Sequence, residues 1–317
     1  MKQPYVQPVR KDRIDLFAAC ALILFSATLG FNQVVVKLVN EGMNPVFQAG
    51  LRSAAGAIVL FVWMLLRGRR IELRDGTMMI GAISAVVFAL EFLLLFLALD
   101  FTTVARTSIF FYTMPVWVAV GAHFLIPEER MTPKRSAGLA LAVAGVVVAL
   151  SRNDSAAGQY SLLGDLLALG GAMAWAAIAL IARATRFSRA SPEMQLLYQL
   201  AISGPLLMVV GPMFGEILRG MTPLMWGGIA FQVLVVVTTL FLFWLWILKV
   251  YPASDMASFA FLAPVFGVFF GWLILGEELS ATIFVSLALV GLGIWLVNSR
   301  RTAPPQTAAR SGVQPGS

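Results

Sequence analysis

Glu91 is the residue whose type and position most directly indicate chemistry. It lies near the middle of a long apolar run, residues 77–99. If that run crosses a bilayer, a charge at its centre costs about 3 kcal/mol or more and needs a function or a partner. Glu91 could contact the amino group of a solute or carry a proton. It could also form a structural ion pair with Arg52 or Lys37, and the sequence leaves these alternatives open.

Uncharged polar and amphipathic aromatic residues also lie within or near apolar runs. Each polar residue could bind a solute or bond to another helix, and interfacial belts explain many Tyr and Trp residues. Trp175 is the strongest aromatic candidate for a cavity, because it lies mid-run among Gly and Ala. An aromatic-rimmed cavity would suit apolar amino acids or flat cations. With Glu91, the candidate substrate-binding residues are Trp175, Tyr112, Tyr198, Asn32, Gln48, Gln195 and Trp244.

Two prolines, Pro115 and Pro264, lie inside apolar runs. Proline interrupts a helix and frees backbone carbonyl groups. We therefore predict that both prolines are hinge points for gating.

Other charged residues lie near the ends of apolar runs, where structural roles are favoured. Lys37 and Arg52 have side chains long enough to reach a membrane interface. We expect Arg106 to be a charge at a helix end. We expect Glu129 and Glu277 to cap the helices that follow them.

The composition places these residues in a membrane protein. Apolar residues make up 59% of the 317 positions and charged residues only 12%, and the mean hydropathy is +0.85. A soluble chain of this length needs a much larger charged surface. The net charge of +7 does not indicate nucleic acid, because Lys and Arg lie in short clusters between apolar runs. Membrane lipid is the expected surrounding.

The sequence carries no signature of an enzyme or of a cofactor. The one histidine, His123, excludes a metal cluster built from histidines. No G-x-x-x-x-G-K-[ST] pattern occurs, so the chain has no P-loop ATPase site of its own. A nucleophile beside a base is not visible either. We therefore expect no enzyme activity, no metal and no cofactor.

Runs of about 20 apolar residues, the length that spans a bilayer, predict an all-α integral membrane protein with ten transmembrane helices. The first run is too long for a signal-peptide core, so we expect it to be retained. The predicted spans are residues 16–39, 46–66, 77–99, 102–125, 135–151, 162–182, 193–214, 223–248, 254–275 and 280–298.

The distribution of basic residues predicts the orientation. If the N-terminus lies inside, only Arg152 and Arg219 fall in the outside segments, and nearly all other Lys and Arg residues fall in the inside segments. Cytoplasmic segments carry the excess of Lys and Arg. Both termini are therefore expected in the cytoplasm.

The two halves of the chain share a pattern. Pro115 and Pro264 each follow a stretch rich in Phe and small residues and precede an acidic pair, and Pro45-Val-Phe-Gln48 matches Pro192-Glu-Met-Gln195 at nearly the same separation. Five spans in each half is an odd number, so the second half must insert with opposite polarity. Inverted repeats are typical of secondary transporters. We expect repeats at residues 1–153 and 154–299, with a disordered cytoplasmic tail at 300–317.

Nearly the whole chain resembles the EamA type of the drug/metabolite transporter superfamily. The resemblance is carried by Ala98-Leu99…Pro115…Glu129, by Gly164-Asp165-Leu166-Leu167…Ala174-Trp175-Ala176, and by Ala263-Pro264…Gly276-Glu277. It implies ten spans in two inverted sets of five. Within that superfamily the chain is most similar to YddG-type exporters of aromatic and other neutral amino acids.

The expected function is therefore that of a secondary transporter in the bacterial inner membrane. The resemblance implies export of aromatic or neutral amino acids, by alternating access through a cavity between the repeats. Spans three, four, eight and nine are expected to line that cavity. The alternatives are an exporter of drugs or other metabolites, or a channel or receptor. The expected partner is a small-molecule solute, with no nucleic acid, and the expected oligomeric state is a monomer.

Overall fold

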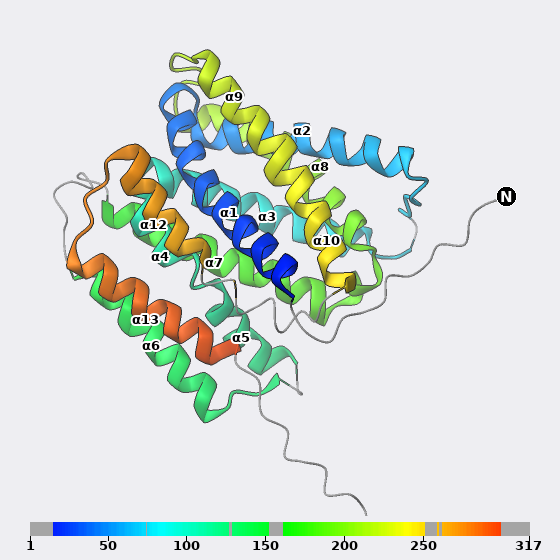
Figure 1. The fold of residues 1–317 in the computed structure, drawn as a ribbon. Coiled ribbons are helices and arrows are strands. Elements are labelled where there is room, and N and C mark those ends of the chain that lie inside the picture. The colour runs from blue at the N-terminus through cyan, green and yellow to red at the C-terminus, as the bar shows by residue number, and fades with distance from the viewer. Residues whose placement is uncertain are drawn as a thin grey trace, which may run out of the picture.

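The computed structural model describes residues 15–73, 75–126, 129–151, 161–250, 259 and 262–298. Within these ranges the regular elements are helices, joined by short connections (Figure 1). They are α1 Leu16–Gly42, α2 Pro45–Leu66, α3 Met78–Phe101, α4 Val104–Phe111, α5 Met114–Leu125, α6 Pro133–Leu150, α7 Ser161–Ala184, η3 Arg186–Arg189, α8 Pro192–Val210, η4 Gly211–Phe214, α9 Pro223–Phe231, η5 Gln232–Leu240, α10 Phe241–Val250, α12 Leu262–Leu275 and α13 Ala281–Asn298.

Eight helical segments of the described chain are long and apolar enough to cross a membrane. They match the first eight predicted spans, so the prediction of a multi-pass helical membrane protein is confirmed. The fourth of them contains α4 and α5, and the eighth contains α9, η5 and the start of α10. The last two predicted spans correspond to α12 and α13, which are apolar but shorter. Part of the predicted span 254–275 lies outside the described residues.

Local sequence signals explain where these helices begin. Asn44 accepts hydrogen bonds from the backbone N–H groups of Val46 and Phe47, and Pro45 follows it at the first helical position. A capping side chain followed by proline satisfies free N–H groups and sets the helical φ angle. The same cap-and-proline pair opens three more helices, at Thr132, Ser191 and Thr222.

Small residues allow several helix pairs to pack closely. On α13, a Cβ atom placed at Gly293 would lie 2.6 Å from the carbonyl oxygen of Gly138 on α6. On α8, a Cβ atom at Gly204 would lie 2.7 Å from the backbone nitrogen of Ala54 on α2. Membrane helices associate through such small-residue faces. Figure 1 shows α6 and α13 side by side at the lower left.

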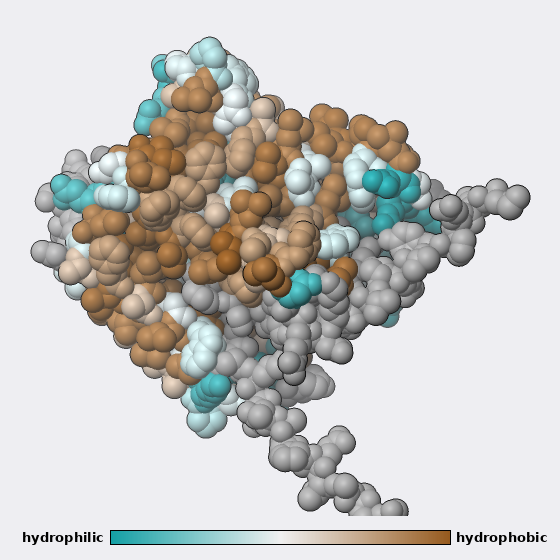
Figure 2. Space-filling view, viewed as in Figure 1, coloured by the Kyte–Doolittle hydropathy of each residue, from teal (hydrophilic) through white to brown (hydrophobic). Residues whose placement is uncertain are grey.

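The outer surface is largely apolar. Figure 2 shows hydrophobic residues over most of the visible face, with hydrophilic residues gathered toward its edges. Large side chains such as Leu66, Phe124 and Val209 are about four-fifths exposed. Soluble proteins rarely expose continuous apolar patches of this kind, whereas a lipid-facing surface requires them.

Candidate functional site

Two buried ionisable residues lie on neighbouring helices. Arg52 on α2 is 4% exposed and Glu91 on α3 is 2% exposed. The two side chains are close enough to interact electrostatically. The guanidinium carbon of Arg52 lies 4.1 Å from the ring centre of Phe92 and 5.2 Å from that of Phe96. Attraction between a cation and aromatic faces therefore helps to hold Arg52 in an apolar surrounding.

Arg52 and Glu91 each have a side-chain atom without a hydrogen-bond partner within the described residues. Nε of Arg52 and Oε2 of Glu91 have no hydrogen-bond partner within the described residues, and no ion pair there joins the two side chains. Gln48 lies one turn before Arg52 on α2, is fully buried, and has an unpartnered amide oxygen and nitrogen. Buried polar groups without partners are rare in native proteins. Two donor nitrogens and two acceptor oxygens are thus left for a polar solute.

More buried polar atoms without partners lie on the helices that pack against α2. Helix α2 contacts α3, α8 and η5. Within the described residues, the unpartnered atoms on α2, α8 and η5 include Oγ of Ser53, Oγ of Ser203 and both amide atoms of Gln232. The hydroxyl of Ser53 and the amide of Gln232 are fully buried. Buried polar atoms without partners within the described residues thus occur on α2 and on two of its neighbours, α8 and η5.

The helix that carries Gln232 is itself unusual. Residues Gln232–Leu240 form a π-helix, in which Thr238 and Thr239 donate side-chain hydrogen bonds to carbonyl groups five residues earlier. π-helical segments are rare and frequently occur at functional sites. Sequence reasoning missed this segment, because a π-turn has no distinct apolar period. The lone Gln232 in the predicted span 223–248 was the available signal.

The predicted residues are not all brought together. Gln48 and Glu91 belong to the polar region around Arg52. Tyr112 is buried at the break between α4 and α5, where its hydroxyl is hydrogen-bonded with Gln33, and Gln33 also accepts from Ser108 at 2.6 Å. Tyr112 therefore belongs to a contact between α1 and α4.

Three other predicted residues have structural surroundings. The amide nitrogen of Gln195 donates to the carbonyl oxygens of Phe187 and Ala190 at 3.0 and 3.1 Å. The ring of Trp244 stacks on Phe25, with centroids 5.4 Å apart. Trp175, expected in a cavity, is 36% exposed on α7. Of the remaining two, Asn32 is partly buried with an unpartnered side-chain oxygen, and Tyr198 lines a pocket between α2 and α8.

Both predicted hinge prolines lie in the first turn of a helix. Helix α4 ends at Phe111 and α5 begins at Met114, so Pro115 follows an actual break in the predicted span 102–125. Pro264 lies near the start of α12. Their role in gating stays a prediction.

The charged residues near the turn between α3 and α4 have partners that the sequence did not reveal. Arg106 is not a simple charge at a helix end. It is buried and forms an ion pair with Asp165 of α7, which also accepts from the hydroxyl of Thr102 at 3.1 Å. Nζ of Lys37 donates to the carbonyl oxygens of Leu99 and Thr102 at 2.9 and 2.5 Å. Lys37 is therefore engaged with α3 and is not the partner of Glu91.

The two capping expectations need correction. Glu277 accepts from the backbone N–H groups of Val104 and Ala105 at 2.7 and 3.0 Å. It therefore caps α4, far away in sequence, instead of the helix that follows it. Burial raises the pKa of the Glu277 carboxyl above its ordinary value. Glu129 forms an ion pair with Arg183, at the end of α7.

Comparison with known proteins identifies the family. The model of the EamA-like transporter family matches residues 16–151 and again residues 162–299. A transporter of uncharacterized function from Bacillus subtilis (strain 168), YoaV, is 25% identical over 86% of this chain and 94% of its own length. A probable amino-acid metabolite efflux pump of Escherichia coli (strain K12) is 25% identical over 86% of this chain and 92% of its own.

A solved crystal structure gives an independent comparison of the fold. It superposes with a TM-score of 0.62 over 88% of this chain and 95% of the other, at 20% identity. At that identity the match supports the fold alone. The two family matches cover nearly all of the described residues, and the described helices are apolar enough to cross a membrane. The chain therefore belongs to the EamA-like transporter family and is a multi-pass transporter of the bacterial inner membrane.

Proposed function

We propose that this transporter exports zwitterionic amino acids or closely related metabolites, and that Arg52 and Glu91 bind the two charged ends of the solute. The observation that carries the proposal is that Arg52 and Glu91 are buried, while Nε of Arg52 and Oε2 of Glu91 have no hydrogen-bond partner within the described residues. A structural ion pair of the same two residues would gain most from direct contact, because leaving buried charges unpaired is costly.

The chemistry of an α-amino acid fits these groups. Its carboxylate matches the planar fork of donors on a guanidinium, and its ammonium group needs an anionic acceptor such as Glu91. Phe92 and Phe96 lie beside Arg52 and offer apolar surface to a solute side chain. The name of the Escherichia coli relative supports amino-acid metabolites as the solute class. Aromatic and other neutral amino acids are the members that we propose first.

The mechanism that we propose is alternating access between two inverted repeats, residues 1–153 and 154–299. The two separate family matches and the matched prolines support a duplication. The excess of basic residues in alternate connections supports cytoplasmic termini. In this arrangement the break before Pro115, the first turn of α12 at Pro264 and the π-helix are the places where helices bend.

The test is counterflow of labelled solutes in liposomes that contain the purified protein. Three probes are compared: phenylalanine, phenethylamine, which lacks the carboxylate, and phenylpropionate, which lacks the ammonium group. Glu91→Gln should lower phenylalanine flux per folded molecule by tenfold or more, because the ammonium group loses its charged acceptor. It should leave phenylpropionate flux within about twofold. Arg52→Gln should show the opposite preference between the two analogues. Glu129→Gln, which removes a partly exposed carboxylate, is the matched control.

Unchanged flux per folded molecule in both variants would remove the pair from the site. An equal loss for all three probes, with a lower yield of folded protein, would assign the pair a structural role. Absence of saturable counterflow with any solute in a panel that includes drugs would favour a channel, because a channel shows no counterflow.

A further inference from the structure

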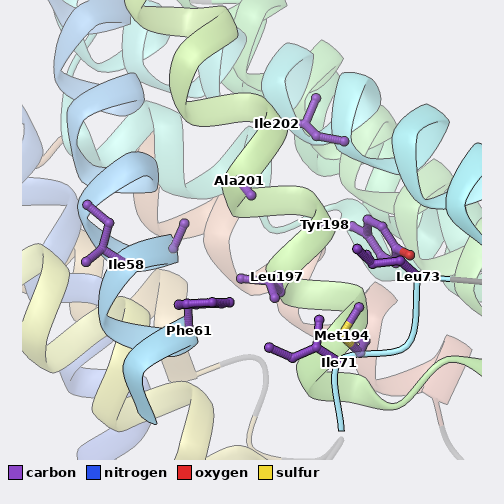
Figure 3. Close-up of a pocket in the computed structure, with 10 residues that line it drawn as sticks. Ile58, Phe61, Ile71, Leu73, Met194, Leu197, Tyr198, Ala201 and Ile202 are labelled. Atoms are coloured by element: carbon purple, nitrogen blue, oxygen red, sulfur yellow. The ribbon is translucent and has the colours of Figure 1, made fainter. Parts of the chain in front are cut away.

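A concave site lies on α2 and α8, about one turn along α2 from Ser53. It is a pocket of about 400 Å³ between α2, α8 and the connection that follows α2. Figure 3 shows Ile58 and Phe61 on one wall, Leu197 and Ala201 on another, and Leu73 closing the end. Ile58 is 65% exposed and Leu73 is 54% exposed. The pocket therefore opens sideways, on the surface that faces lipid.

The accessible lining of the pocket is apolar, and one buried polar atom lies beside it. Tyr198 is 6% exposed, and its hydroxyl has no hydrogen-bond partner within the described residues. Figure 3 shows the hydroxyl beside Leu73, at the end of the pocket formed by the connection after α2. Buried hydroxyl groups in native proteins normally form a hydrogen bond. An oxygen atom of a bound molecule could fill that need, if its apolar part lay along the pocket.

Basic residues lie in the two chain segments next to this end of the pocket. The connection that supplies Leu73 and Ile71 begins directly after α2, and η3 packs on the pocket through Phe187, which joins one apolar cluster with Ile71 and Tyr198. The exposed arginines of these two segments are Arg67, Arg69, Arg70, Arg186 and Arg189.

Fewer carboxylates lie in the same region, and two of them are engaged. Arg69 lies 3.8 Å from the carboxylate of Glu193, and Asp75 accepts from the backbone and hydroxyl of Thr77. Glu72 is exposed. The two segments beside the apolar groove thus carry more exposed positive charges than negative ones.

We propose that this groove binds an anionic phospholipid. An acyl chain lies along Phe61, Leu197 and Ala201, the hydroxyl of Tyr198 donates to an ester or phosphate oxygen, and the arginines hold the headgroup. Clusters of basic residues directly beside a membrane helix attract anionic lipids in this way. The proposal does not rest on the proposed binding of solute at Arg52 and Glu91.

The probes are dioleoyl phosphatidylglycerol and dioleoyl phosphatidylcholine, titrated into delipidated full-length protein and followed by native mass spectrometry. The wild-type protein should bind phosphatidylglycerol in preference. Arg67→Gln/Arg70→Gln should weaken that binding about 25-fold, at about fivefold for each arginine near the surface. The control Arg130→Gln/Lys134→Gln removes two exposed cations, one before α6 and one in its first turn, and should change binding by less than twofold.

Two further variants test the groove and the hydroxyl. Ala201→Phe places a ring in the groove from an exposed position on α8 and should reduce binding of both lipids. Tyr198→Phe keeps the ring and should weaken binding of phosphatidylglycerol several-fold, with the melting temperature measured in parallel as a check on the fold. Equal binding of the two lipids by the wild-type protein would overturn the proposal. So would a loss in Arg67→Gln/Arg70→Gln no larger than in the control, or unchanged binding in Ala201→Phe.

Discussion

The ion pair between Arg106 and Asp165 gives a stability prediction that follows directly from the structure. Nε of Arg106 donates to both carboxylate oxygens of Asp165 at 3.1 Å, and both side chains are at most 5% exposed. Asp165→Asn leaves the guanidinium buried without its counter-charge. Breaking a buried pair by removing one partner costs about 3–5 kcal/mol. We therefore expect the free energy of unfolding to fall by about that amount.

The measurement is reversible unfolding in mixed micelles with increasing sodium dodecyl sulfate, followed by near-UV circular dichroism. The control is Glu129→Gln, which breaks the ion pair with Arg183. These side chains are 29% and 46% exposed, so the expected loss is only about 0–1 kcal/mol.

A double variant separates the charge effect from lost packing. In Arg106→Met/Asp165→Leu both charges are replaced by apolar groups, which is often neutral or stabilising for a buried pair. The double variant should therefore be more stable than Asp165→Asn, with a favourable coupling energy in the mutant cycle. An Asp165→Asn variant within about 1 kcal/mol of the wild type would refute the reasoning, as would a double variant as unstable as the two single losses combined.

Three further predictions follow from other contacts. Glu277→Ala should lower the unfolding free energy by about 1–3 kcal/mol, because two backbone N–H groups of α4 lose their acceptor; the same micelle titration measures this. Gly293→Ala should cost about 1–3 kcal/mol, since its Cβ would lie 2.6 Å from a carbonyl oxygen of α6. The matched change Gly291→Ala meets open space and should lose nothing. In a Cys20→Ser background, cysteines at positions 307 and 158, outside the described residues, should label from opposite sides of intact cells, and labelling of both from outside would contradict the topology.

The helices could be predicted from the sequence because hydropathy and capping are local properties. The predicted spans 46–66 and 162–182 differ by one or two residues from Pro45–Leu66 and Ser161–Ala184. Asn44 and Ser191, each before a proline, mark helix starts in the sequence itself. The break before Pro115 was signalled by the proline, although the span was predicted as continuous.

The partners of the charged residues could not be predicted, because they depend on which helices meet. Asp165 lies 59 residues from Arg106, and Glu277 lies 173 residues from Val104. Nothing local in the chain distinguishes a buried ion pair from a charge at a helix end. The same holds for Glu91. From the sequence, either Arg52 or Lys37 could be the partner of Glu91. In the structure Lys37 donates to the carbonyl groups of Leu99 and Thr102, so Arg52 is the cation that remains for Glu91.

Two polar regions of the described molecule differ in whether their hydrogen bonds are complete. At the turn between α3 and α4, Lys37, Asp165 and Glu277 bring charged atoms from three different parts of the chain, and each binds a named partner. Such a region is rigid, because moving any one helix would leave a buried charge unpaired. Around Arg52 and Glu91, buried donors and acceptors lack partners, so a bound solute can supply hydrogen bonds that the empty protein does not have. If the proposed solute site is correct, the energy of solute binding is concentrated at α2 and α3, where it favours one arrangement of the helices over another.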